Sequence, residues 1–188
     1  MSQNKDKILF FRESTFKVAE LIFNFPNKTF HVRLLEKETG FSTTAVNSSV
    51  EELADYSIVK IEETPITKNI KADLESDAYR FYKQIFNLYR LRRYQIINNL
   101  VKAYNNPKAI VLFGSFAKGE DIEESDVDLL IITNNKPEEF LNKSIIRIEK
   151  ILNRKISIHA FPNLDNSSAE FKNAVTNGIV LHGYLKVI

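Results

Sequence analysis

Two apolar runs with a polar segment between them restrict the fold of this chain more than any other feature. They lie in AIVLFGSFAKGEDIEESDVDLLIIT, from Ala109 to Thr133. A short apolar run bounded by turn signals is typical of a strand buried inside a sheet. We therefore predict two buried strands, with a Gly-Ser turn at the end of the first, in a chain of the α/β (α+β) class.

The polar segment carries the residues that suggest chemistry. Gly114 would let a phosphate approach the backbone closely, and the Ser115 hydroxyl and exposed N–H groups can hold its oxygens. Asp126 and Asp128 alternate along the second strand, so their side chains should project to the same side. Such a pair is costly unless a divalent cation such as Mg²⁺ neutralises it. The alternative is a polar strand start that only caps a loop.

The spacing of these residues resembles a known family signature. In GSFAKGEDIEESDVDLLI, Gly-Ser is followed after ten residues by Asp-x-Asp, which is similar to the nucleotidyltransferase superfamily related to DNA polymerase beta, and among its members to the minimal nucleotidyltransferases. The resemblance implies that Gly114, Ser115 and nearby amides bind a triphosphate and that Asp126 and Asp128 hold Mg²⁺ or Mn²⁺. A nucleoside monophosphate would then pass from a nucleoside triphosphate to an acceptor hydroxyl, releasing pyrophosphate. Lys118 is either a further phosphate contact or a solvated loop lysine.

One part of the family pattern is missing. Active members of the superfamily carry a third carboxylate on a neighbouring strand, but the expected strand reads KISIHAF, and Ser157 stands where we align that aspartate. Serine adds no charge and is a poor base, so nucleotide binding could persist while activation of the acceptor fails. His159, on the same face, is a candidate base or an ordinary packed residue. Asp165 and Glu170 are further candidates in a loop and at a helix start.

The first 76 residues have a different pattern. Helical periodicity runs from Ser14 to Asn24, a short helix is expected over 29–38, and Ser42 can cap a third helix that places Val46, Val50 and Leu53 on one face. Two alternating segments, SIVKIEE and ITKNIKAD, then predict a hairpin. This arrangement resembles a winged helix-turn-helix domain, which precedes minimal nucleotidyltransferases in many proteins.

The resemblance makes the helix from Ser42 to Asp55 the recognition helix of a domain over residues 1–76. Its exposed face would offer base contacts, whereas Glu51 and Glu52 would repel the DNA backbone. The predicted contact residues are Thr43, Thr44, Asn47 and Ser48. The alternative is a small helical domain with no role on DNA.

Residues 77–105 read as one long linking helix that is apolar nearly all round, and at about 1.5 Å per residue it would span roughly 40 Å. Such a helix could join two domains or pair with a second copy, so we expect a homodimer. Arg90, Arg92 and Arg93, beside Tyr89 and Tyr94, form either a nucleic-acid patch or a solvated or ion-paired face. Residues 106–188 should form the nucleotidyltransferase-like domain, with a small mixed sheet.

Composition narrows the function classes further. The formal net charge of +2 implies no strong overall attraction to nucleic acid, and the lack of cysteine excludes disulfides, thiolate metal sites and a cysteine nucleophile. No apolar run is long enough for a signal peptide or a membrane span, so we expect a cytoplasmic protein. Two hypotheses remain: a nucleotidyltransferase that uses a nucleoside triphosphate, and a transcriptional regulator that binds duplex DNA and keeps an impaired nucleotide-binding domain.

Overall fold

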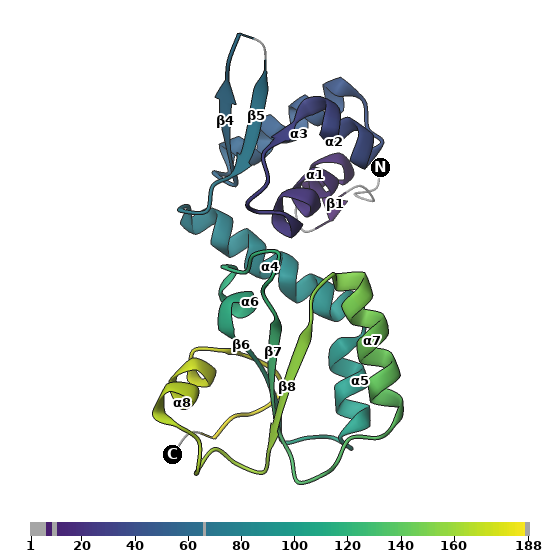
Figure 1. Cartoon of the computed structure of the whole chain (residues 1–188), viewed down its shortest axis with the longest axis vertical. Coiled ribbons are helices and arrows are strands. Elements are labelled where there is room, and N and C mark those ends of the chain that lie inside the picture. The colour runs from purple at the N-terminus through teal and green to yellow at the C-terminus, as the bar shows by residue number, and fades with distance from the viewer. Residues whose placement is uncertain (1–6, 9–10, 66, 187–188) are drawn as a thin grey trace, which may run out of the picture. The chain divides into compact units, whose positions relative to one another are not determined.

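The computed structural model of the chain describes residues 7–8, 11–65 and 67–186 (Figure 1). The chain divides into two compact units, Met1–Phe86 and Asn87–Ile188. The boundary lies inside helix α4 (Asp77–Arg93), which contributes side chains to both units. The mixture of helices and sheets confirms the α+β class expected from the sequence.

The first unit combines helices with short antiparallel sheets. Its elements are β1 (Lys7–Ile8), β2 (Phe11–Arg12), α1 (Glu13–Asn24), β3 (Phe30–His31), α2 (Val32–Thr39), α3 (Thr43–Asp55), β4 (Val59–Glu63), β5 (Lys68–Ala72) and the first part of α4. β1 pairs with β2, and the other three strands form a sheet in the order β3-β5-β4. Strand β3 was not predicted, because two residues are too few to show an alternation of apolar and polar side chains.

Helix α3 forms as its sequence pattern predicts. The Ser42 hydroxyl accepts a hydrogen bond from the backbone N–H of Ala45 at 3.4 Å, which satisfies a donor at the helix start. Val46, Val50 and Leu53 are fully buried, so the apolar face inferred from their spacing is the packed face. α3 packs against α1 and α2.

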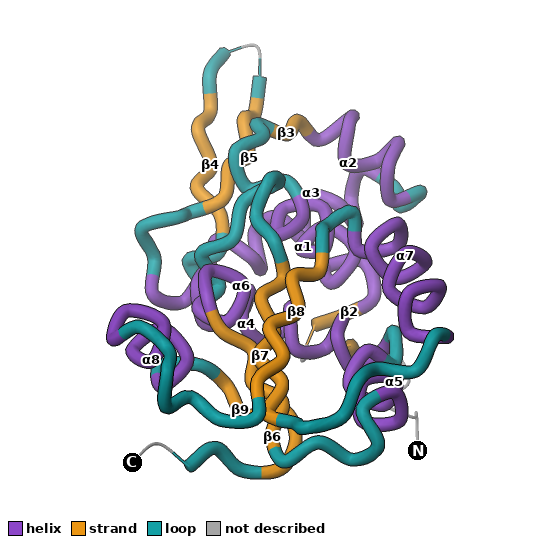
Figure 2. The backbone as a smooth tube through the Cα atoms, turned by 60° about the horizontal axis from the view of Figure 1, so that its bottom comes forward, coloured by secondary structure: helices purple, strands orange, loops and turns teal. Residues whose placement is uncertain are grey.

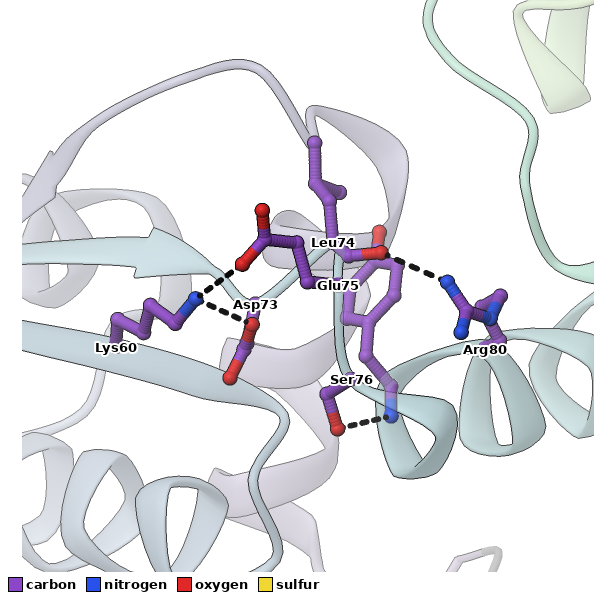
Figure 3. Close-up of polar contacts among 7 residues, drawn as sticks. Lys60, Asp73, Leu74, Glu75, Ser76 and Arg80 are labelled. Atoms are coloured by element: carbon purple, nitrogen blue, oxygen red, sulfur yellow. Dashed lines mark hydrogen bonds and ion pairs between the residues drawn. The ribbon is translucent and has the colours of Figure 1, made fainter.

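A short turn connects β5 to helix α4 (Figure 3). Lys60 of β4 reaches across to Asp73 at 2.8 Å and to Glu75 at 3.4 Å. The Ser76 hydroxyl accepts a hydrogen bond from the N–H of Tyr79, and Arg80 donates to the carbonyl oxygen of Leu74. These contacts fix the start of α4 at the end of the hairpin.

The second unit contains a four-stranded mixed sheet in the order β8-β7-β6-β9. β6 pairs antiparallel with β7 and with β9, whereas β7 and β8 are parallel. The elements are α5 (Ile96–Ala103), β6 (Ala109–Phe113), α6 (Gly114–Lys118), β7 (Val127–Ile132), α7 (Phe140–Leu152), β8 (Ile156–Phe161), α8 (Ala169–Thr176) and β9 (Ile179–Gly183). Figure 2 shows α5 and α7 on one side of this sheet and α8 on the other.

The two faces of the sheet bury separate sets of side chains. Ile110, Leu112 and Leu129 pack with α5 and α7, whereas Val111 and Leu130 pack with α8. All five residues of β6 are buried. Burial on both faces explains why β6 and most of β7 are continuous apolar runs rather than alternating ones.

The structure differs from the single helix predicted over residues 77–105. α4 ends at Arg93, and α5 begins at Ile96 after Gln95 adopts a left-handed backbone conformation with φ of 59°. Leu91 and Ile96 both belong to the core cluster against the sheet. In an uninterrupted helix, residues five apart point about 140° away from each other, so the helix must break for both to reach one core.

Arg90 of α4 differs from both interpretations of this segment, whereas Arg92 and Arg93 are exposed, as expected for a solvated face. Arg90 is buried, and its guanidinium donates a hydrogen bond to the carbonyl oxygen of Leu152 at 2.7 Å. Leu152 is the last residue of α7, where a cation is favoured by the helix dipole. Arg93 is exposed and donates to the Tyr89 hydroxyl at 2.6 Å. Arg90 therefore has a structural role and does not belong to an exposed patch.

Candidate functional site

The turn between β6 and α6 brings the backbone close to the second strand. Gly114 has a φ of 74°, and a Cβ atom at this position would lie 2.5 Å from Oδ2 of Asp128. Phe113 and Asp128 are direct partners in the β6–β7 pairing, which explains the close approach. Glycine is therefore required twice here, for the backbone conformation and for the space that the Asp128 carboxylate occupies.

The two predicted carboxylates lie at the start of β7. Asp126 comes directly before the strand and Asp128 is its second residue, and both side chains are partly buried. Ser157 of β8 is the register partner of Asp128, and its hydroxyl donates a hydrogen bond to Oδ2 of Asp126 at 3.1 Å. The structure thus brings together Asp126, Asp128 and the serine at the position expected for a third carboxylate.

His159 lies on the same face as Ser157, where it meets an aromatic cluster. Its ring centroid is 5.6 Å from that of Phe113 and 5.6 Å from that of Phe171 on α8. Phe171 also contacts Phe161, at 5.8 Å between centroids. His159 acts electrostatically on Asp128. His159 therefore packs in an aromatic cluster and is also close enough to Asp128 to affect its charge.

The environment of Asp128 disfavours its charged form. Burial raises the pKa of the Asp128 carboxyl above its ordinary value, and the nearby charge of Asp126 raises this pKa further, while His159 opposes the shift. The two like charges share one corner of the sheet. A divalent cation between them would relieve this repulsion.

For the other predicted phosphate-binding residues, Ser115 and Lys118, we describe no contact with either aspartate. Ser115 is partly buried in the first turn of α6, where its carbonyl oxygen accepts from the backbone N–H of Glu120 at 3.0 Å. Lys118 is exposed at the end of α6. Within the described part of the chain, no ion pair joins Lys118 to either aspartate.

A buried network that the sequence analysis missed holds the loop between α6 and β7. Asn87 of α4 donates hydrogen bonds to the Asp121 carboxylate at 2.7 Å and to the carbonyl oxygen of Phe116 at 2.9 Å. Asn87 and Asp121 are both nearly inaccessible to solvent. Further along the loop, the Ser125 hydroxyl accepts from the N–H of Ile122. In the sequence, the only indication of this role is that Asn87 is a polar residue among the apolar residues of α4.

An open cleft of about 430 Å³ lies beside Asp126. Its walls come from the loop before β7 and from the end of α7, and they carry both signs of charge. The lining residues include Ser125, Asp126, Glu149, Lys150 and Lys155. Glu149 accepts a hydrogen bond from the N–H of Ile156 at 2.8 Å, so this carboxylate fixes the start of β8.

The two alternative donors named from the sequence lie away from this corner. Asp165 lines a different cavity together with Lys108 and Tyr184, and Glu170 is exposed in the first turn of α8. Over residues 7–8, 11–65 and 67–186, no group of three or more His, Cys, Asp or Glu side chains could hold a metal ion by itself. Any cation here would take its remaining ligands from a substrate or from water.

The predicted DNA-contact residues lie on the outer face of α3 in the first unit. Thr43, Thr44 and Ser48 are exposed, whereas Asn47 is partly buried and donates to the carbonyl oxygen of Thr43 at 3.1 Å. A hollow of about 710 Å³ lies between α2 and the hairpin, lined by residues that include His31, Arg33 and Lys68. Arg33 and Lys68 were not singled out in the sequence, because they are far apart along the chain.

The two glutamates expected to oppose DNA are partly neutralised or turned away. Glu51 lies 3.9 Å from the ammonium group of Lys68. Glu52 accepts a hydrogen bond from the Thr15 hydroxyl at 2.7 Å, on the side of α1. The negative charge of α3 is therefore less available to its outer face than the sequence suggests.

Comparison with known proteins matches the second unit to nucleotidyltransferases. Residues 95–184 match the family model described as polymerase beta, nucleotidyltransferase. A Methanocaldococcus jannaschii protein with the provisional name protein adenylyltransferase is 41% identical over 63 residues, which cover 31% of this chain and 62% of that protein. The chain thus spans less than two thirds of the relative's length. No solved structure was found to match the chain.

The family match supports the nucleotidyltransferase superfamily for the segment that contains the two aspartates, and both matches support a transferase activity in general terms. The family match extends over β6, α6, β7 and β8, which supply the corner described above. No described helix is both long enough and apolar enough to cross a membrane.

Asp128→Asn should stabilise the metal-free protein at neutral pH. The folded-state pKa of Asp128 is raised, so the stability linked to its protonation is present below the unfolded-state pKa, about 3.9, and is lost as pH rises through the folded-state value. We expect Asp128→Asn to have a higher Tm than the wild type at pH 7 in EDTA. The gain should shrink towards pH 4.

Thermal unfolding followed by circular dichroism at both pH values measures this difference. Glu120→Gln, which changes an exposed carboxylate on the preceding loop, serves as the control and should leave Tm unchanged at both. A lower Tm for Asp128→Asn than for the wild type at pH 7 would contradict the electrostatic account.

Proposed function

We propose that the chain transfers a nucleoside monophosphate from a nucleoside triphosphate to an acceptor hydroxyl, using Asp126 and Asp128. One observation carries the proposal: the two carboxylates lie at one corner of the sheet, against a glycine whose missing side chain makes room for Asp128. The match of residues 95–184 to polymerase beta nucleotidyltransferases supports the same reaction class.

The residues at this corner fit a divalent cation that is completed by substrate. Mg²⁺ in phosphoryl-transfer sites is usually held by one or two carboxylates together with phosphate oxygens and water, and Asp126 and Asp128 supply that number. Mg²⁺ or Mn²⁺ bound there would neutralise charge on the triphosphate. Gly114 and Ser115, at the start of α6, offer backbone N–H groups beside the same position, and Lys118 is free to reach a phosphate from the end of α6.

The transfer itself is a displacement at the α-phosphorus. The acceptor oxygen forms a bond to this phosphorus as the bond to the bridging oxygen breaks, and pyrophosphate leaves with the electron pair. The acceptor proton passes to a base or to water. The open cleft beside Asp126 offers an approach to this carboxylate, and its mixed charges suit a polar acceptor. The name of the Methanocaldococcus relative supports a hydroxyl on a protein as that acceptor.

We expect Ser157, at the position of the third carboxylate, to make the transfer slow. Its hydroxyl donates to Asp126 and so orients that carboxylate, but it cannot supply the negative charge of a third ligand. His159 is the remaining candidate base on this face, and its ring is packed between Phe113 and Phe171. Slow transfer with intact nucleotide binding is the expected behaviour.

Replacing either aspartate should strongly reduce transfer. With wild-type protein, Mg²⁺ or Mn²⁺ and each nucleoside triphosphate in turn, we expect pyrophosphate release that depends on an added peptide containing Ser, Thr and Tyr, or on the protein itself. Asp126→Asn and Asp128→Asn should each lower the rate by about 10²–10³-fold, because charge stabilisation in the transition state is lost.

Glu120→Gln again provides a matched carboxylate-to-amide control and should retain the wild-type rate. Labelled nucleotide on the peptide or on the protein identifies the acceptor. Pyrophosphate release that persists equally in both aspartate variants would refute the assignment of the site.

Ser157→Asp should make the protein depend on a divalent cation for stability. The substitution removes the hydrogen bond to Asp126 and adds a third charge beside it, so in EDTA we expect a loss of about 1–3 kcal/mol. Mg²⁺ should restore Tm in this variant much more than in the wild type. The rate of pyrophosphate release should rise as well, if the missing carboxylate limits it.

Ser157→Ala removes the same hydrogen bond without adding charge, so it should show no additional response to Mg²⁺. Thermal unfolding with EDTA and with Mg²⁺ separates the two variants. An equal effect of Mg²⁺ on Ser157→Asp and on the wild type would show that position 157 does not face the cation.

A second candidate function is binding of duplex DNA by the first unit as a winged-helix domain. It is supported by the order of three helices followed by a hairpin, with exposed Thr43, Thr44 and Ser48 on α3. The pairing of Glu51 with Lys68 lowers the negative charge that would oppose it, and Arg33 lies exposed at the neighbouring hollow.

Arg33→Gln should weaken binding to a mixed-sequence duplex and reduce the dependence of log K on log salt by about one, as expected for the loss of one phosphate contact. Fluorescence anisotropy at several salt concentrations measures both quantities. Arg147→Gln, an equal charge change on the exposed surface of α7, should have no effect. Equal effects of the two substitutions would indicate attraction by net charge only.

A further inference from the structure

A second cavity, of about 370 Å³, lies at the opposite end of the sheet from the two aspartates. Lys108 and Ile132 line it. In the β6–β7 register Ala109 pairs with Ile132, and Phe113 pairs with Asp128. At about 3.3 Å per residue, the four residue steps from one pair to the other separate the cavity from the aspartates by roughly 13 Å. The cavity is therefore distinct from the proposed transfer site.

Positive charge predominates in this cavity. Lys108, Lys172 and Lys186 line it, and the one carboxylate among the lining residues is that of Asp165. The Lys172 ammonium group donates to the backbone carbonyl oxygen of Asp165 at 3.0 Å. This hydrogen bond does not involve the Asp165 carboxylate. Among the described residues, no carboxylate forms an ion pair with Lys108 or Lys186. The four side chains together carry a net charge of +2.

The walls of the cavity are fixed by backbone contacts. The N–H of Lys108 donates to Ile132 at 2.8 Å, and its carbonyl oxygen accepts from Tyr184 at 3.2 Å. Gly183 has a φ of 67°, and a Cβ atom there would overlap the Lys108 carbonyl oxygen. This close approach holds the segment after β9 against the start of β6. On the other side, the N–H of Asp165 donates to the Asn163 side chain at 3.1 Å.

The cavity also offers apolar and aromatic surface. Leu164 and Ile132 are almost fully buried and belong to the core cluster beneath α8, so they form an apolar floor to the cavity. Leu185 packs against the same cluster. Tyr184, at the rim, is 74% exposed, the highest value among the large exposed apolar and aromatic side chains of the described residues. An exposed ring beside cations suits a flat partner with a charged group.

We propose that this cavity binds a small phosphorylated molecule that carries a flat ring, with the phosphate on Lys108, Lys172 and Lys186 and the ring against Tyr184 and the apolar floor. The net charge of +2 balances a phosphate dianion. The volume lies at the lower end of the range for small-molecule sites, about 300–1,000 Å³. This inference does not depend on the proposed transfer reaction, because it uses none of its residues.

The test compares three probes on the full chain in EDTA, so that no divalent cation can recruit phosphate to the aspartates. Phenyl phosphate carries both the ring and the charge, inorganic phosphate carries the charge only, and AMP tests a nucleoside as the source of the ring. We expect phenyl phosphate or AMP to bind more tightly than inorganic phosphate in calorimetric titrations. In ¹H–¹⁵N spectra, Lys108, Leu164 and Tyr184 should shift, and Asp126 and Asp128 should not.

Lys108→Gln should weaken the binding of phenyl phosphate by about two- to fivefold, as expected for one exposed charge contact. The Tyr184→Ala variant should bind phenyl phosphate only about as tightly as it binds inorganic phosphate. Lys143→Gln, on the exposed surface of α7, is the matched control and should bind as the wild type does. The amide spectrum of each variant verifies that it is folded.

Three outcomes would overturn the proposal. Equal affinity for phenyl phosphate and inorganic phosphate would remove the role of the ring. Unchanged binding in Lys108→Gln would place the phosphate elsewhere, and shifts confined to Asp126 and Asp128 would assign all binding to the other end of the sheet. Loss of pyrophosphate release in the aspartate variants alone would leave this site unaffected, so the two proposals fail separately.

Discussion

Burial of β6 and β7 on both faces is the constraint on which the second unit depends. Apolar side chains on both faces need cover on both sides, and α5 and α7 provide it on one face while α8 provides it on the other. Polar groups are then restricted to the strand ends, because a charge inside either strand would lose its hydration without a partner. Both sites that we propose for this unit consequently lie at the two ends of one pair of strands.

The two ends differ in charge. At the end where β7 begins, Asp126 and Asp128 create a negative corner, where we propose that a cation and a triphosphate bind. At the end where β6 begins, three lysines around an apolar floor create a positive cavity. The paired strands β6 and β7 lie between the two regions and keep them apart. A single small sheet thus presents two chemically different surfaces without any insertion into its core.

The sequence predicted those parts of the structure that depend on local spacing. The Gly-Ser turn, the alternation of Asp126 and Asp128, the cap at Ser42 and the hairpin strands all follow from patterns within a few residues. The break at Gln95 could not be predicted, because neither glycine nor proline marks it and only the need to bury Leu91 and Ile96 together produces it. The hydrogen bond of Arg90 to the end of α7 could not be predicted either, because it joins residues 62 positions apart.

Long-range polar contacts were equally invisible in the sequence. Asn87 and Asp121 lie 34 positions apart, and only the folded chain shows that one holds the loop that leads to the aspartates. The lysines of the positive cavity come from three separate segments, so no charge cluster marks them in the sequence. Spacing within a motif can indicate the kind of chemistry, whereas the support for that motif depends on the packing of distant segments.

Helix α4 contributes to the cores of both units. Tyr79 and Phe86 pack against Phe23 in the first unit, and Lys83 donates to the Phe23 carbonyl oxygen there. Asn87 and Leu91 are buried in the second. No cut within this helix leaves both halves with a complete interior. Anyone who wishes to study either half alone must retain residues 77–93 in each piece, and the surface left bare on the unused side will need polar replacements to remain soluble.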